Sequence, residues 1–267
     1  MKDVYNIYIN KFWNRFMEKI YPGYSRRKED EALRIAEAYI NNNQNLKEVI
    51  KYIENSSDSI GLSLKDYASL YATVIRIKPK VVLECGTGKS TSIIAQAMMD
   101  NQKNVSTDNL KLISMEQDKR WHEIAVSTLP ERFKDFVEIH YSPVEISDHA
   151  FFQGTAYSDI PKYPYEFVFI DGPKQHLDGK SNLCNMDFIN ILKNSNNPIS
   201  AFIDNRLNTV MAYSFLFGPS KVKYFKAWGH SIIEKVTIND ILIDDKTKRK
   251  ILWSYLVQQS YARPDGI

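Results

Sequence analysis

The sequence predicts an α/β fold in which a doubly wound, mostly parallel sheet of about seven strands is covered by helices on both faces. From Ser63 onward, short apolar segments alternate with segments of helical periodicity, which is the pattern of strand–helix–strand units. The segment 167–170 is apolar without interruption, as expected for a strand buried on both faces. Two glycines, Gly86 and Gly88, follow the first of these strands. Such turns between a strand and a helix are typical of this fold class.

The expected elements alternate along the chain. Strands are predicted at 81–83, 112–115, 137–141, 167–170 and 199–203, followed by two further β segments at 222–228 and 232–238. Helices are predicted at 64–77, 90–99, 120–129, 183–192 and 210–217. Parallel strands need crossover connections, so their carboxyl ends lie at one edge of the sheet, where ligands of such sheets bind. The residues that follow each strand are therefore the candidates for function.

Residues 1–62 are expected to form a helical extension of a domain that spans residues 63–267. Apolar residues recur at every fourth position from Val4 to Ile20, with basic residues on another face. We expect this stripe to pack against the body of the protein or against a second subunit, which would give a homodimer. A helix lying on a membrane surface would show the same pattern. Pro22-Gly23 ends this helix, and a second helical segment is expected at 29–53.

Composition argues against several classes of function. The net charge is only +3 over 267 residues, so no nucleic-acid partner is expected. No apolar run reaches the ~18 residues of a membrane span, and the N-terminus lacks the core of a signal peptide. The two cysteines, Cys85 and Cys184, match neither a disulfide framework nor a metal-binding spacing. We therefore expect a cytoplasmic protein without a transmembrane segment.

The segment after the first strand, Glu84-Cys85-Gly86-Thr87-Gly88-Lys89-Ser90, has the features of a ligand-binding turn. Its two glycines let the backbone approach a ligand closely. Gly88-Lys89-Ser90 matches the end of a phosphate-binding loop, but the glycine that such a loop needs five residues earlier is Leu83. A nucleoside triphosphatase and a turn without a ligand are therefore the weaker interpretations.

Glu116 ends the second predicted strand. An acidic side chain at this position can accept hydrogen bonds from both hydroxyls of a ribose. Together with the glycine turn, Glu116 predicts a ligand that carries a free ribose diol.

From Val81 to Arg206 the sequence resembles the class I S-adenosylmethionine-dependent methyltransferases, which have a Rossmann-like fold. The resemblance implies S-adenosylmethionine as the cofactor, with Glu116 on its ribose and Glu84 near its methionine end. The loop after the third strand, which contains Ser142, would hold the adenine. The other cofactor-binding residues that the resemblance implies are Gly86, Gly88, Ser90 and Asp171.

The ends of the fourth and fifth strands resemble one branch of this family, the metal-dependent O-methyltransferases related to catechol O-methyltransferase. Asp171 follows the fourth strand, and Asp204-Asn205 follows the fifth. The resemblance implies that Asp171, Asp204 and Asn205 hold Mg²⁺ and that Lys174 is the general base. Mg²⁺ prefers carboxylate and amide oxygens, and it lowers the pKa of a bound hydroxyl. His176 is a second candidate for the base.

The expected activity is methyl transfer to a hydroxyl of a small molecule or sugar, with a vicinal diol as the favoured acceptor. Two other functions remain open: a metal-independent methyltransferase with His176 as the base and Asp171 as its partner, and an inactive protein that binds the cofactor or a partner without turnover. In a purely structural interpretation, Asp171 and Asp204 would each cap the turn that follows its strand.

Overall fold

The computed structural model describes residues 19, 23–56, 62–102, 109–150, 152–242, 259–260 and 264–267. The predicted helix from Val4 to Ile20 lies outside these residues except for Lys19. Its packing against the body or a second subunit therefore remains a prediction. In the part of the chain that is described, every helix is too short or too polar to cross a membrane.

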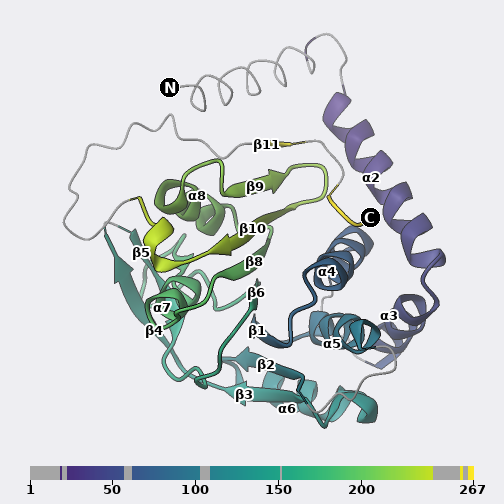
Figure 1. Cartoon of the computed structure of the whole chain (residues 1–267), viewed down its shortest axis with the longest axis horizontal. Coiled ribbons are helices and arrows are strands. Elements are labelled where there is room, and N and C mark those ends of the chain that lie inside the picture. The colour runs from purple at the N-terminus through teal and green to yellow at the C-terminus, as the bar shows by residue number, and fades with distance from the viewer. Residues whose placement is uncertain are drawn as a thin grey trace.

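The main sheet has eight strands in the order β11-β9-β10-β8-β6-β1-β2-β3 (Figure 1). Their bounds are β1 Val81–Cys85, β2 Lys111–Glu116, β3 Val137–Tyr141, β6 Phe167–Ile170, β8 Ile199–Asp204, β9 Val222–Phe225, β10 His230–Val236 and β11 Gln259–Ser260. The five strands from β3 to β8 run parallel, and β10 is antiparallel to both of its neighbours. The order reverses between β1 and β6, so the chain winds outward in both directions from this point. This is the doubly wound, Rossmann-like sheet that the sequence predicts.

Helices cover both faces of the sheet (Figure 1). On one side lie α2 Tyr24–Asn41, α3 Gln44–Ser56, α4 Leu64–Ile77, α5 Lys89–Asn101 and α6 Lys119–Thr128. On the other side lie α7 Asp187–Lys193 and α8 Leu207–Phe217. Each face has its own hydrophobic core, because alternate side chains of every central strand point to opposite faces.

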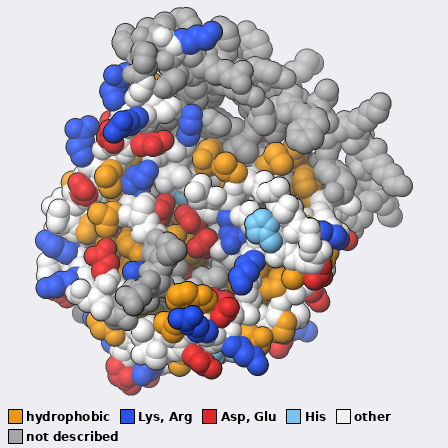
Figure 2. Space-filling view, turned by 180° about the vertical axis from the view of Figure 1, so that it is seen from behind, with side chains coloured by type: hydrophobic (Ala, Val, Ile, Leu, Met, Phe, Trp, Pro, Cys, Tyr) orange, Lys and Arg blue, Asp and Glu red, His pale blue; other side chains and the backbone are white. Residues whose placement is uncertain are grey.

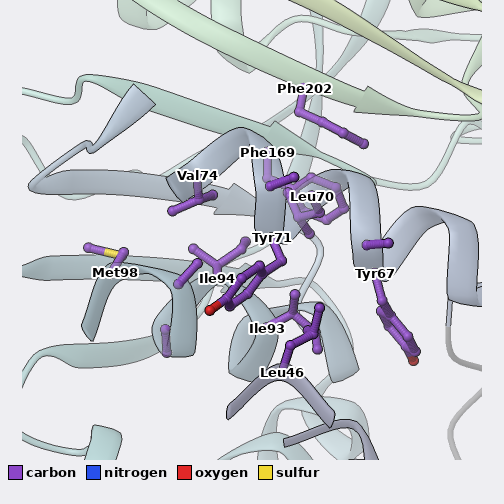
Figure 3. Close-up of a cluster of buried hydrophobic side chains, with 14 of the residues drawn as sticks. Leu46, Tyr67, Leu70, Tyr71, Val74, Ile93, Ile94, Met98, Phe169 and Phe202 are labelled. Carbon is purple, nitrogen blue, oxygen red and sulfur yellow. The ribbon is translucent and has the colours of Figure 1, made fainter. Parts of the chain in front are cut away.

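The core beneath α3, α4 and α5 joins helix residues to the aromatic side chains of β6 and β8 (Figure 3). The rings of Phe169 and Phe202 lie 5.7 Å apart, and both side chains are fully buried, as are Leu46, Leu70 and Ile93. Burying one such side chain contributes about 1.5–3 kcal/mol to stability. The buried face of α2 belongs to the same core, so the described part of the N-terminal extension packs on the domain. The domain boundary at residue 62 remains a prediction.

The predicted helical segment 29–53 is two helices, and this correction has a local cause. Asn42 and Asn43 separate α2 from α3, and the Asn43 side chain donates a 2.8 Å hydrogen bond to the Tyr39 carbonyl. Asparagine competes with helix hydrogen bonds in this way and favours helix ends. The start of α4 is also fixed locally, because Ser63 and Asp66 form a reciprocal capping box.

A second, three-stranded sheet is formed by segments that connect strands of the main sheet. It consists of β4 Val144–His149, β5 Phe152–Tyr157 and β7 Cys184–Asn185. The connection from β3 to β6 therefore contains a β-hairpin where the alternating pattern favours a helix. The prediction of a helix at 183–192 was wrong at its beginning: Cys184 and Asn185 pair with β5, and the helix begins only at Asp187.

The small sheet depends on the absence of a side chain at Gly154. A Cβ there would lie 2.1 Å from the Cys184 carbonyl oxygen. We expect Gly154→Ala to force β5 and β7 apart and to lower the free energy of unfolding by about 1–3 kcal/mol, the usual cost of overpacking. Urea denaturation measures this loss. Gln153→Ala, at the neighbouring exposed position, should change stability by less than about 0.5 kcal/mol. Equal effects of the two substitutions would contradict this account.

Candidate functional site

Two turns meet at the carboxyl ends of β1 and β6, where the strand order reverses. Gly86 has a φ of +98°, and a Cβ on it would lie 2.9 Å from the Gly172 backbone nitrogen. A Cβ on Gly172 would lie 2.7 Å from the Gly86 nitrogen and 2.7 Å from the Tyr157 hydroxyl. The two backbones are therefore in direct contact, which only glycine at both positions allows. The turn after β1 is thus placed against the turn that carries Asp171 and Lys174.

Glu84 lies beneath the first turn and is fully buried. Its carboxylate accepts hydrogen bonds from the hydroxyls of Ser90, Thr91 and Ser114 at 2.5–2.6 Å. The Gly88 backbone N–H donates to Thr91 Oγ1 at 3.2 Å. This network holds the glycine turn in place from below. The carboxylate and the Ser90 hydroxyl are thus already engaged within the protein.

Glu116 ends β2 beside this turn and is 7% exposed. Its Oε1 accepts hydrogen bonds from the backbone N–H groups of Gln117 and Asp118 at 2.7 and 2.8 Å, which fixes the orientation of the carboxylate. Within the described residues no hydrogen bond reaches Oε2. Burial raises the pKa of Glu116, although the two N–H groups and the charge of Lys174 oppose this rise.

Glu116 lines a cavity of about 310 Å³ between α3, α5 and α6. Its polar lining residues are Thr87, Gly88, Lys89, Thr91, Ser92, Glu116, Gln117, Asp118, Thr128 and Lys174. Its mostly apolar lining residues are Ile53, Trp121, Ile124, Ala125, Leu129 and Ile139. A site of this size with a few convergent polar groups is typical of small-molecule binding.

Ser142 does not line this cavity. It is fully buried, and its hydroxyl accepts a hydrogen bond from the Asp159 backbone N–H at 3.1 Å. Its backbone N–H donates to the Glu116 carbonyl at 2.8 Å. The structure therefore places Ser142 as a support of the loop after β3, with its side chain turned into the protein.

Asp171 lies at the end of β6 beside Arg206. The Arg206 Nε is 3.5 Å from Asp171 Oδ1, and the two side chains are 11% and 41% exposed, respectively. Burial raises the pKa of Asp171, and the Arg206 charge partly offsets this effect. The carboxylate of Asp171 is thus accessible but already has one cationic partner.

Asp204 ends β8, which pairs with β6. Asp204 is 9% exposed, and its Oδ1 is buried without a hydrogen-bond partner among the described residues. Burial, and next the negative charges of Asp66 and Asp171, raise the pKa of Asp204 to about 8. The structure therefore brings the carboxylates of Asp171 and Asp204 within electrostatic reach of each other.

Asn205 follows Asp204 and is exposed, with a φ of +31°. Its backbone N–H donates to the Gly229 carbonyl at 2.9 Å. Among the described residues, no three His, Cys, Asp or Glu side chains are grouped so that they could hold a metal ion. A metal site here would thus combine Asp171 and Asp204 with the Asn205 amide oxygen.

The two candidate bases are both exposed. Lys174 lines the cavity with Glu116, and its backbone N–H donates to Gln117 Oε1 at 3.0 Å. His176 lies two residues farther along the same loop and does not line the cavity. The structure therefore brings Lys174, but not His176, to the cavity wall.

Sequence reasoning missed Arg206 and Asn185. Arg206 Nη1 donates to the Pro173 carbonyl at 2.7 Å, and Nη2 donates to the Asp171 carbonyl. Asn185 Nδ2 donates to the Gly172 carbonyl at 2.8 Å. The position of Arg206, directly after Asp204-Asn205, was a signal that could have pointed to it. Asn185 lies in a segment expected to be helical and gave no such signal.

No protein-family model and no curated protein sequence matches this chain. Among solved structures, it is similar to the O-methyltransferase TomG from Streptomyces achromogenes, involved in tomaymycin synthesis and bound to S-adenosylmethionine, with 17% identity, 73% of this chain and 90% of that chain covered, and a TM-score of 0.46. It is also similar to an O-methyltransferase from Bacillus cereus in complex with S-adenosylhomocysteine, with 18% identity, 74% of this chain and 96% of that chain covered, and a TM-score of 0.45. A methyltransferase from Geobacter sulfurreducens is similar at 13% identity, with 76% of this chain and 97% of that chain covered and a TM-score of 0.42. The assignment of the fold rests on the order and the directions of the strands.

The burial of Glu84 makes a prediction about stability. Burial raises its pKa to about 7, against the three hydroxyl hydrogen bonds and with a small contribution from the charge of Asp171. Below about pH 4.5 both the folded and the unfolded chain hold this proton, so the free energy of unfolding is not reduced. As the pH rises to about 7, the unfolded chain releases the proton first, and this favours unfolding. The free energy of unfolding of Glu84→Gln, relative to that of the wild type, should therefore rise by on the order of 3 kcal/mol between pH 5 and pH 8.

Urea denaturation at several pH values measures this difference. Glu131→Gln is the matched control, because the Glu131 side chain is 87% exposed. If the free energies of unfolding of the wild type and Glu84→Gln differ by a constant amount across the pH range, burial does not raise the pKa of Glu84.

Proposed function

We propose that this chain is an S-adenosylmethionine-dependent methyltransferase that acts on a hydroxyl group. The observation that carries the proposal is the cavity at the carboxyl ends of β1 and β2. It joins a glycine turn at the start of a helix to an oriented acidic side chain, Glu116, at the end of the second strand. A ligand with a ribose diol and a flat, mostly apolar base suits this lining of polar and apolar side chains.

In this proposal, Glu116 Oε2 accepts hydrogen bonds from the ribose hydroxyls, and the backbone at Gly86 and Gly88 lies against the cofactor. Glu84 and Ser90 act from below, because their side chains are engaged with each other. Ser142 supports the loop beside the adenine, and Asp171 lies near the methionine end.

Two substitutions test the cofactor site. Glu116→Ala removes charge-assisted hydrogen bonds worth roughly 1.5–3 kcal/mol, so affinity for S-adenosylmethionine should fall about ten- to a hundredfold. A Cβ at Gly88 meets no atom closer than Ser90 Oγ at 4.0 Å, so Gly88→Ala should fold normally. Its methyl group would occupy cavity space and weaken binding by roughly tenfold.

Calorimetric titration with S-adenosylmethionine, S-adenosylhomocysteine and ATP measures these affinities, with Glu131→Ala as a surface control. Unchanged cofactor affinity in Glu116→Ala would contradict the ribose assignment. Tight binding of ATP without binding of S-adenosylmethionine would favour a phosphate-binding turn instead.

We further propose that Asp171, Asp204 and the Asn205 amide hold a divalent cation, with Mg²⁺ as the expected ion. Two findings support the fit: the buried Asp204 Oδ1 lacks a hydrogen-bond partner among the described residues, and burial, followed by the negative charges of Asp66 and Asp171, raises the pKa of Asp204. A cation at this position would satisfy that oxygen and relieve the repulsion. When bound, Mg²⁺ would lower the pKa of an acceptor hydroxyl.

A side chain of the protein would then remove the proton of the acceptor hydroxyl. Lys174, at the cavity wall, would accept the proton of the acceptor hydroxyl when its amine is neutral. The oxygen could then attack the sulfonium methyl carbon in line, so that a C–O bond forms as the C–S bond breaks and S-adenosylhomocysteine leaves. His176 is the alternative base, with Asp171 as its partner in a metal-independent reaction. The favoured acceptor is a vicinal diol on a sugar or another small molecule, because its two neighbouring oxygens could both bind the cation.

A metal titration tests the cation site without a known acceptor. We expect Mn²⁺, used as a spectroscopic substitute for Mg²⁺, to bind the wild type and to bind Asp204→Asn at least about tenfold more weakly, because one charged ligand is lost. Asp178→Asn, in the neighbouring exposed loop, is the control and should bind normally. Equal affinities in all three proteins would exclude this site.

Release of S-adenosylhomocysteine from S-adenosylmethionine, with a panel of catechols and sugars as acceptors, measures turnover. With any acceptor found, EDTA should abolish the reaction, Mg²⁺ should restore it, and Lys174→Ala should slow it by roughly 10²–10⁴-fold. Full activity in EDTA would favour the metal-independent alternative. A normal Lys174→Ala enzyme beside an inactive His176→Ala enzyme would assign the base to His176. Cofactor binding without turnover of any acceptor would favour an inactive binding protein.

A further inference from the structure

All three carbonyl oxygens of the Asp171–Pro173 turn are bound by side chains from other elements. Arg206 donates to the first and the third of these carbonyls, with a 2.7 Å hydrogen bond to Pro173. Asn185, from β7, donates to the second, that of Gly172, at 2.8 Å. Turn carbonyls usually face water, so their capture by side chains is a specific arrangement.

The next residue, Lys174, is held at both of its backbone groups. Its N–H donates to Gln117 Oε1 at 3.0 Å, and its carbonyl accepts from Thr155 Oγ1 at 2.9 Å. Side chains from four separate segments of the chain therefore converge on four consecutive residues. The turn that presents Asp171 and Lys174 has its backbone fixed, although the Lys174 side chain is exposed.

Arg206 makes the largest number of these contacts. Its side chain is 11% exposed, and its Nε also lies 3.5 Å from Asp171 Oδ1. A planar guanidinium can reach two carbonyls and a carboxylate at once, because its donors diverge in a fixed fork. A lysine would keep the positive charge but could not reproduce this geometry. The arrangement thus uses the shape of arginine in addition to its charge.

We propose that Arg206 is a positioning residue, which fixes the turn 171–174 so that Asp171 and Lys174 keep one geometry relative to the cofactor cavity. It acts through the turn and touches neither cofactor nor acceptor. The catalytic meaning of this role rests on the proposed function, whereas the rigidity of the turn does not. Small errors in the placement of reacting groups reduce turnover strongly.

Amide hydrogen exchange of the segment that contains Lys174 tests the inference directly. We expect Arg206→Met to speed exchange there by about tenfold or more, because two charge-assisted hydrogen bonds are lost. Arg206→Lys should lie between Arg206→Met and the wild type. Arg76→Met is the control, since Arg76 is a partly buried arginine that pairs with Glu234 at 2.7 Å and lies away from this turn. It should leave this segment unchanged.

Unchanged exchange at the turn in Arg206→Met would overturn the inference, and if that variant does not fold, unchanged exchange in Arg206→Lys would do so. Affinity for S-adenosylhomocysteine, measured on the same samples, should stay within about threefold of the wild type. A wild type that does not bind this ligand would overturn the proposed function and leave the exchange result intact.

A third measurement separates positioning from a merely structural role. With an acceptor from the hydroxyl panel, Arg206→Lys should lose about tenfold or more in kcat while its KM for S-adenosylmethionine stays constant. Normal kcat together with faster exchange would show that the fixed turn has no part in turnover.

Discussion

The contact between the Gly86 and Gly172 backbones determines the rest of this site. Because β1 and β6 are adjacent parallel strands, their carboxyl ends open at the same place, and the last sheet hydrogen bond joins the Asp171 N–H to the Cys85 carbonyl at 2.9 Å. The glycines let the two turns continue side by side beyond the sheet. The Tyr157 hydroxyl closes the contact from the small sheet and donates to the Met115 carbonyl at 3.2 Å. A side chain at either glycine would push the two turns apart.

Polar groups are buried where geometry has to be fixed, and this costs stability. Asp187 is fully buried, and burial raises its pKa to about 7. It accepts hydrogen bonds from the Tyr157 backbone N–H and from Asn185 Nδ2, both at 2.8 Å. The same Asn185 amide holds the Gly172 carbonyl. Such groups are tolerated only when they are hydrogen-bonded, and these hydrogen bonds connect the small sheet to the turn above it. Burial of apolar side chains in the two hydrophobic cores offsets the cost of burying these polar groups.

The small sheet and the cavity both arise from departures from regular helix packing. The hairpin β4–β5 stands where a crossover helix would lie, and it supplies Thr155 to the turn at Lys174. On the other face, α6 has no fully buried side chain, so it does not close against α5. The space between these helices, bounded by Ile53 of α3, is the cavity. The cavity thus exists because the packing of this region is incomplete.

The sequence by itself predicted the central strands, because the short apolar runs 81–83 and 167–170 alternate with segments of helical periodicity. It also indicated the strand ends at Glu116, Asp171 and Asp204, since their spacing and chemistry are local properties. It did not determine that Cys184-Asn185 pairs with β5, because a two-residue strand is specified by its partner and not by its own pattern. Only the tertiary structure decided that Ser142 turns inward, that Lys174 lies at the cavity, and that Arg206 holds the turn. These results depend on contacts between residues distant in the sequence, from Ser142 and Asp159, 17 positions apart, to Arg206 and Asp171, 35 positions apart. Such contacts form only when the strands have come together.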